Sequence, residues 1–137
     1  MIVIVDTPVW SLVLRRHPGH LNASEQVLAK ALTELIREGR VEMLGPIRQE
    51  LLSGIREASQ FETIRRYLRA FQEPLLEIAD YEEAARMSNQ CRGRGISGST
   101  IDFLICAAAH RHKKAVFTTD QAFQRYASVL PLHLYSA

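Results

Sequence analysis

The chain has 137 residues, 47% of them hydrophobic and 23% charged, which is typical of one folded domain and excludes a disordered chain. Its 17 basic and 15 acidic residues give a net charge of +2, too small to indicate a nucleic-acid partner by itself. With two cysteines and no CxxC pair, no apolar run of about 20 residues and no basic leader, we expect a single domain over residues 1–137 in a reducing, cytoplasmic compartment, without a membrane span or signal peptide.

Short apolar runs alternate with amphipathic stretches along the chain. Residues 2–5 form a continuous β-branched run, typical of a strand buried on both faces of a parallel sheet. Capping residues, glycines and prolines bound the other elements, and the alternation predicts an open α/β sheet. In chain order we expect helices over about 22–37, 46–55, 61–71, 80–91, 99–111 and 121–126, and further strands over 41–44, 75–78, 115–118 and 132–135.

Four acidic residues fall where such a sheet binds ligands, beyond the carboxyl ends of its strands. Two carboxylates about 4 Å apart repel by about 4 kcal/mol at an effective dielectric constant near 20, so a cluster of them needs protons or cations. Oxygen ligands favour Mg²⁺ or Mn²⁺, and such ions activate water for attack on phosphodiesters. The four candidates are Asp6, Glu50, Asp102 and Asp120.

Each acid also has a purely structural interpretation. Asp80 follows an expected strand as well, and spacing alone does not exclude it from the set. For the four candidates the structural alternatives are that Asp6 is a turn residue, Glu50 a solvated helix residue, Asp102 the acidic member of a capping box with Ser99, and Asp120 a helix cap.

Four segments, residues 5–10, 49–52, 100–107 and 116–123, resemble the PIN-domain ribonucleases, and among these the VapC-type toxins of toxin–antitoxin pairs. The resemblance covers essentially the whole chain. It implies a three-layer α/β/α sandwich with a central parallel sheet of about five strands in the order 3-2-1-4-5. It also implies hydrolysis of RNA phosphodiester bonds with Mg²⁺ or Mn²⁺.

The resemblance assigns roles to particular residues. It implies that Asp6, Glu50, Asp102 and Asp120 are catalytic metal ligands. Thr118 matches the family's hydroxyl position two residues before the last acid. The implied strand order places the third strand at the sheet edge, and so makes Asp80 a helix cap.

Two positions depart from the family's pattern. Pro8 stands where a hydroxyl is common, and Ala122 stands where many members have a further acid, which leaves open whether one or two metal ions bind. The resemblance also implies an antitoxin partner, an RNA substrate and a homodimer. The alternative is a catalytically impaired PIN-like module that binds RNA or protein.

A glycine-rich loop over 93–98 has the literal pattern GxGxxG, which is typical of dinucleotide sites when it follows a strand. Here a helical pattern precedes it, so that site is a rival interpretation without its expected context. Arg92 and Arg94 beside this loop are candidate contacts for RNA phosphates.

Overall fold

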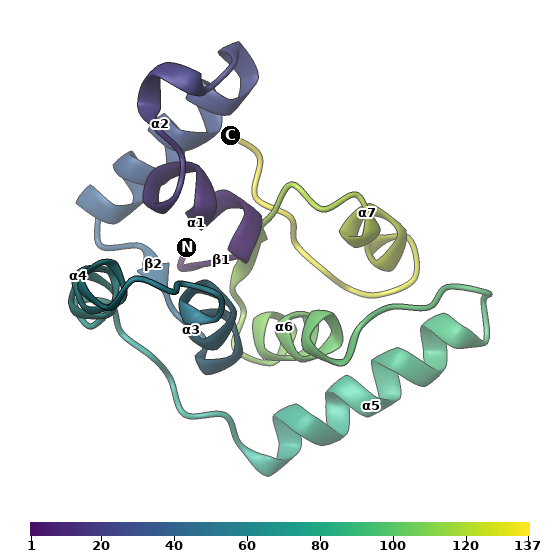
Figure 1. The fold of residues 1–137 in the computed structure, drawn as a ribbon. Helices are drawn as coiled ribbons and strands as arrows, with labels where there is room; N and C mark the ends of the chain where they lie inside the picture. The colour runs from purple at the N-terminus through teal and green to yellow at the C-terminus, as the bar shows by residue number, and fades with distance from the viewer.

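A computed structural model describes all 137 residues, and its helices surround a short parallel sheet (Figure 1). The strands are β1 (Val3–Val5), β2 (Val41–Glu42) and β3 (Ala115–Phe117), in the spatial order β2-β1-β3. The central strand β1 is at most 1% exposed at every residue, which explains its unbroken β-branched run.

The helices pack on both sides of this sheet. In Figure 1, α1 and α2 lie on one side, and α5 and α6 lie against each other on the opposite side. A core cluster of 28 buried residues joins the layers. None of the helices combines the length and the apolar character needed to cross a membrane. The helix bounds are α1 (Thr7–Leu14), the 3₁₀ helix η1 (Pro18–His20), α2 (Ala23–Arg37), α3 (Gly45–Leu52), α4 (Ala58–Leu68), α5 (Ile78–Arg92), α6 (Thr100–Arg111) and α7 (Ala122–Ala127).

The predicted fold class is confirmed, but the sheet is smaller than five strands. Its outer positions are single parallel bridges, Glu42 with Gln72 and Val116 with Leu134. The predicted strand over 75–78 is wrong, because the chain meets β2 earlier, at Gln72, and α5 begins at Ile78. The strand predicted over 132–135 is reduced to the bridge at Leu134.

The structure adds one helix that was not predicted and changes the role of one acid. No element was predicted over residues 6–21, yet α1 begins at Thr7, because Pro8 suits the first turn of a helix and Asp6 caps it. Asp80 is not the cap of α5: Glu77 is, and Asp80 is its partner three residues later in a capping box.

The glycine-rich loop follows a helix and not a strand, so the dinucleotide interpretation lacks its structural context. Gly95, with a φ of 77°, turns the chain at the end of α5. The backbone N–H of Ile96 then donates to the carbonyl oxygen of Cys91 at 2.9 Å. The loop therefore terminates α5 and leads into α6.

Candidate metal centre

Asp6 joins the end of β1 to the start of α1. Its backbone N–H donates to the carbonyl oxygen of Phe117, the last residue of β3, at 2.8 Å, which ties Asp6 to the end of that strand. Its Oδ1 accepts from the backbone N–H of Thr7 at 2.9 Å and caps α1. The residue is only 6% exposed. The helix cap is thus also a nearly buried carboxylate at the edge of the sheet.

Two threonine hydroxyls connect Asp6 with other predicted acids. Thr118 Oγ1 donates to Asp6 Oδ2 at 2.7 Å and accepts from the backbone N–H of Asp120 at 3.0 Å. Thr7 Oγ1 donates to Glu50 Oε2 at 2.8 Å. The resulting chain of contacts runs from α3, through the start of α1, to the loop after β3. Thr118 is thus in contact with Asp6 and with the backbone of Asp120, whereas the bond from Thr7 to Glu50 had no sequence signal.

Asp102 lies in the first turn of α6. Ser99 caps this helix by accepting from the backbone N–H of Asp102 at 3.0 Å. The Asp102 carboxylate does not return that bond, as a capping box would require, but accepts from the Tyr126 hydroxyl at 2.6 Å. Asp102 is therefore held by a side chain from α7, a contact that the sequence analysis missed because no spacing connects the two residues.

Asp120 serves in part as a helix cap, which was its structural alternative. Its Oδ1 accepts from the backbone N–H of Ala122 at 2.9 Å, which caps the turn into α7. The residue at the family's further acidic position, Ala122, supplies only this backbone contact. Pro8, the other departure, occupies the first turn of α1, where its missing N–H costs no hydrogen bond.

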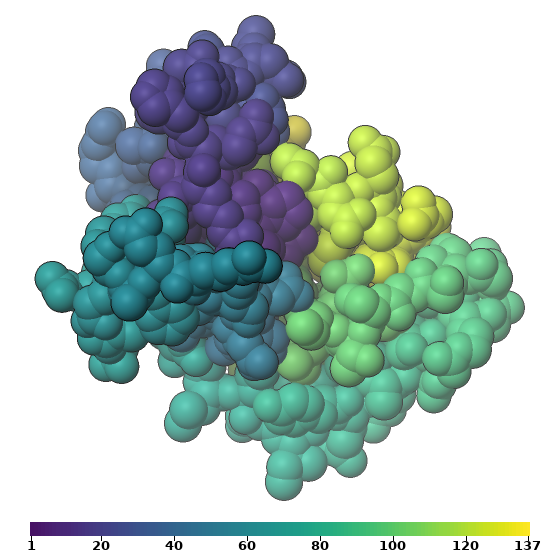
Figure 2. Space-filling view, viewed as in Figure 1, coloured from purple at the N-terminus to yellow at the C-terminus, as the bar shows by residue number.

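Electrostatic effects connect Asp6 with Glu50 and Asp102, and connect Asp102 and Asp120 with Tyr126. Burial and the negative charges of Asp102 and Glu50 raise the pKa of Asp6, against the opposing hydrogen bonds from Thr118 and Thr7. Burial, the hydrogen bond to Asp102 and the charges of Asp102 and Asp120 raise the pKa of Tyr126. In Figure 2 the segments that carry or adjoin these acids, from α1, α3, α6 and α7, meet around a notch near the centre of the face.

The four carboxylates have no counter-ion within the protein. None of them takes part in a salt bridge within 4.0 Å. No three of them bring oxygens within 4.8 Å of one another, a spread that like charges favour. A set of uncompensated carboxylate oxygens fits a hard divalent cation better than zinc, which prefers His and Cys.

Asp80, the residue that spacing could not exclude, lies elsewhere. It forms a compact cluster with Glu77 and His112, together with Arg111. Its Oδ1 meets Arg111 Nη1 at 2.6 Å and His112 Nε2 at 3.1 Å, and its Oδ2 accepts from the backbone N–H of Glu77 at 2.7 Å. These contacts occupy both oxygens and tie α5 to the end of α6 opposite Asp102, so the cluster is an ion-pair network.

The two predicted RNA contacts lie at the end of α5. Arg92 is the last residue of the helix, and its Nη1 approaches Asn89 Oδ1 at 3.4 Å. Arg94 follows in the turn, and both side chains are exposed. Neither arginine forms a hydrogen bond or salt bridge with the four acids.

Gly98 packs closely against Tyr126. A Cβ at Gly98 would overlap the ring and hydroxyl of Tyr126, which is only 1% exposed. We therefore expect Gly98→Ala to lower the free energy of unfolding by about 1–3 kcal/mol, the usual cost of overpacking. Urea denaturation of the metal-free chain measures this.

Gly93→Ala is the matched control in the same loop. Its φ of −62° is helical, and the nearest atom to an added Cβ is the carbonyl oxygen of Gln90 at 3.5 Å. This variant should be at least as stable as the native chain. Equal stability of the two variants would contradict the close contact between Gly98 and Tyr126.

Comparison with known proteins gives a family and a fold. The sequence model of one family, described as "PIN domain", matches residues 3–129. The solved structure titled "Crystal structure of VapBC2 from Rickettsia felis bound to a DNA fragment from their promoter" is similar, with a TM-score of 0.77, 15% identity and coverage of 98% of each chain.

Two further solved structures have the same fold. FitAcB from Neisseria gonorrhoeae has a TM-score of 0.74 and 18% identity, covering 98% of this chain and 97% of that chain. VapBC-1 from nontypeable Haemophilus influenzae has a TM-score of 0.70 and 16% identity, with the same coverage. At such identities the structural likeness establishes the fold alone.

Proposed function

The chain belongs to the PIN domain family, and on this premise we propose that it is a metal-dependent endoribonuclease that acts as the toxin of a toxin–antitoxin pair. The observation that carries the proposal is the set of four acids. They come from distant parts of the sequence, and no basic side chain forms a salt bridge with any of them. The charges of Glu50 and Asp102 raise the pKa of Asp6, and the Thr118 hydroxyl connects Asp6 with the backbone of Asp120. A carboxylate as buried as that of Asp6, which is 6% exposed, is ordinarily paired with a cation.

The acids Asp6, Glu50, Asp102 and Asp120 would hold Mg²⁺ or Mn²⁺. The bound ion would supply an activated water and a positive charge beside the phosphate. The protein's own part is to fix the carboxylates before the substrate arrives, by the hydroxyl of Thr118 on Asp6 and by the hydroxyl of Tyr126 on Asp102.

RNA would approach this edge of the sheet past the end of α5. Arg92 and Arg94 are exposed there and form no salt bridge, so their charges are free to meet phosphates. Contacts of this kind release counter-ions from the RNA and make its affinity fall with salt.

Cleavage of a labelled single-stranded RNA in Mg²⁺ or Mn²⁺ tests the function. We expect turnover in either ion, complete loss on chelation with EDTA, and recovery when the ion is restored. Turnover that persists in EDTA would exclude a metal mechanism. RNA binding that is equally tight in Ca²⁺ and Mg²⁺, without turnover, would favour the impaired binding module that Pro8 and Ala122 suggest.

A cognate antitoxin and a homodimer are the proposed protein partners. Another solved structure of this fold, with a TM-score of 0.69 and 15% identity over 88% of this chain and 89% of that chain, is described as a toxin–antitoxin complex from Klebsiella pneumoniae, and the proposal extends this pairing to the present chain. For the homodimer, the surface that supports it is an apolar patch before and in the first turns of α5, formed by Leu75, Ile78 and Tyr81, which are 90%, 79% and 54% exposed.

Ile78→Asp tests the apolar patch as the dimer interface. Light scattering should give the native chain about twice its mass of 15.5 kDa and the variant about one chain mass, because a buried charge opposes association. Val27→Asp is the control, since Val27 is 57% exposed on α2, outside the patch. A monomeric native chain, or a dimeric Ile78→Asp, would reject this interface.

A further inference from the structure

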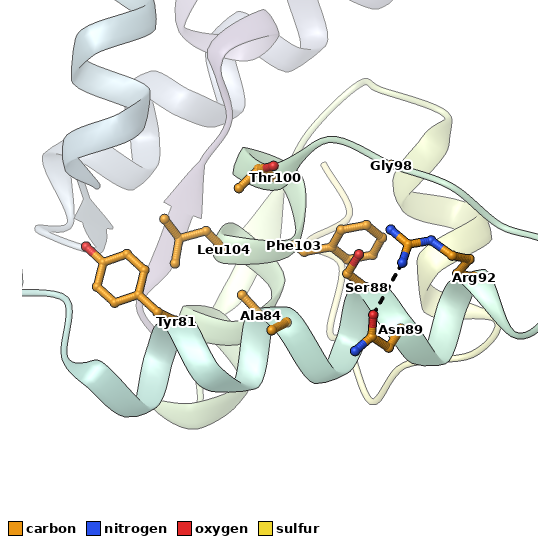
Figure 3. A pocket seen from close by; sticks show the side chains of 10 residues that line it. Tyr81, Ala84, Ser88, Asn89, Arg92, Gly98, Thr100, Phe103 and Leu104 are labelled. Atoms are coloured by element: carbon orange, nitrogen blue, oxygen red, sulfur yellow. Dashed lines mark hydrogen bonds between the residues drawn. The ribbon is translucent and has the colours of Figure 1, made fainter.

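A cavity of about 380 Å³ opens between α5 and α6 (Figure 3), large enough for a small organic group. One face of α5 lines it with Tyr81, Ser88, Asn89 and Arg92, and α6 contributes Thr100 and Phe103. In Figure 3 the Ser88, Asn89 and Arg92 side chains gather beside the Phe103 ring, while Tyr81 lies at the far end. The Ser88–Arg92 end is polar, and the Tyr81 end adjoins the apolar patch.

The polar end of the cavity lies beside the candidate metal centre. Thr100 is in the first turn of α6, as is Asp102. Gly98, which also lines the cavity, touches the Tyr126 hydroxyl that donates to Asp102. The Phe103 ring packs on Tyr126 with centroids 5.0 Å apart. The wall of the cavity is therefore also the support of a proposed metal ligand.

The chemistry of this end suits a planar, polar group. Asn89 and Ser88 offer both donors and acceptors, and the buried Phe103 gives an apolar floor. The guanidinium of Arg92 has no acidic partner, and its one side-chain contact is the long bond to Asn89. Unpaired bases are recognised by this combination, in which one face stacks on an aromatic ring or guanidinium and the edge forms hydrogen bonds.

We propose that the Ser88–Arg92 end of this cavity is a subsite for one unpaired base of the RNA substrate, next to the phosphate that is cleaved. Asn89 reads the edge of the base, and Arg92 stacks on its face. The inference rests on the proposed nuclease function and adds a residue that determines sequence preference.

Sequencing of the cleavage products from a random 20-nucleotide single-stranded RNA pool in Mn²⁺ tests the subsite. The native chain should prefer one base at a single position beside the cut, and Asn89→Ala should reduce that preference about tenfold, the effect of roughly one lost base-edge contact. Gln90→Ala is the matched control, because Gln90 is adjacent but does not line the cavity. An unchanged preference in Asn89→Ala would overturn the subsite.

A second measurement does not require cleavage. In NMR titrations of the native chain with the four nucleoside 5′-monophosphates, at least one should shift the backbone amides of Asn89 and Thr100 but not that of Arg86, which lies outside the cavity on α5. Ribose 5-phosphate, which has no base, should not shift them. If no monophosphate shifts these amides, the subsite is wrong, even when the RNA pool is cleaved. An RNA pool that stays uncleaved rejects the nuclease function and is a separate result.

Discussion

The Asp6→Asn variant is expected to lose at least about 100-fold of its Mn²⁺-dependent RNA cleavage, and to be no less stable than the native chain when both are free of metal. The loss of cleavage follows from removing a nearly buried charge that would hold the ion. The amide keeps the shape of the carboxyl group. Its oxygen can still accept from Thr7, and its nitrogen can donate to Thr118, so the local bonds survive.

The stability part of this prediction follows from the raised pKa of Asp6. A carboxyl whose pKa is raised on folding binds protons more tightly in the folded state than in the unfolded chain. The stability of the metal-free protein therefore falls as the pH rises from the ordinary value of 3.8 through the raised one, and the full penalty remains above it. An asparagine side chain does not ionise, so Asp6→Asn removes this pH-dependent loss of stability.

Cleavage rates in Mn²⁺ and urea denaturation in EDTA measure the two effects separately. Glu34→Gln is the control, because Glu34 is an exposed acid on α2 that forms no salt bridge. It should match the native chain in both assays. If Asp6→Asn cleaves at the native rate, Asp6 is not a metal ligand. If it unfolds more easily than the native chain, the carboxylate has a structural role that outweighs repulsion.

The sequence predicts the position of Asp6 because a strand buried on both faces is visible as an unbroken β-branched run. An acid directly after such a run must lie at the edge of the sheet. Asp102 was predictable for a related reason, since Ser99 is a good helix cap and the acid three residues later falls in the first turn. Both signals lie within a few residues of the acid, and the structure contains both the strand before Asp6 and the helix that carries Asp102.

Contacts between distant elements were not predictable. Nothing in the spacing of Asp102 and Tyr126 indicates their hydrogen bond, and Gly98 looks like an ordinary loop glycine until its neighbour in space is known. The wrong strand over 75–78 has a different cause. Leu75 and Ile78 are exposed apolar residues, and a single sequence does not distinguish an exposed apolar patch from a buried strand.

The second large effect is expected from Asp80→Asn, which should lower the free energy of unfolding by about 3 kcal/mol. The side chain of Asp80 is completely buried, and it faces Arg111 and His112, which are 29% and 33% exposed. Loss of the carboxylate leaves the Arg111 charge in a partly desolvated site with only the exposed Glu77 carboxylate, at 3.7 Å, as its partner. Since the cluster lies at the opposite end of α6 from Asp102, cleavage by the folded fraction should be unchanged.

Comparison with an exposed acid shows whether burial is the cause. Burial alone would raise the pKa of Asp80, but the hydrogen bonds from the Glu77 backbone, Arg111 and His112 outweigh it and lower the pKa. The hydrogen bond from Arg65 lowers the pKa of Glu62 as well, yet that side chain is 43% exposed. Glu62→Gln should therefore change stability little, because water screens exposed pairs.

The pH dependence of unfolding gives the sign of the Asp80 contribution. A carboxyl whose pKa is lowered on folding stabilises the protein above its ordinary value of 3.8, and this stabilisation is lost as the pH falls through the lower folded value. Urea denaturation between about pH 2 and pH 6 should therefore show a flatter acid limb in Asp80→Asn than in the native chain. Parallel acid limbs would mean that Asp80 has the same pKa in the folded and unfolded states, and that its hydrogen bonds and ion pairs do not stabilise the ionised form.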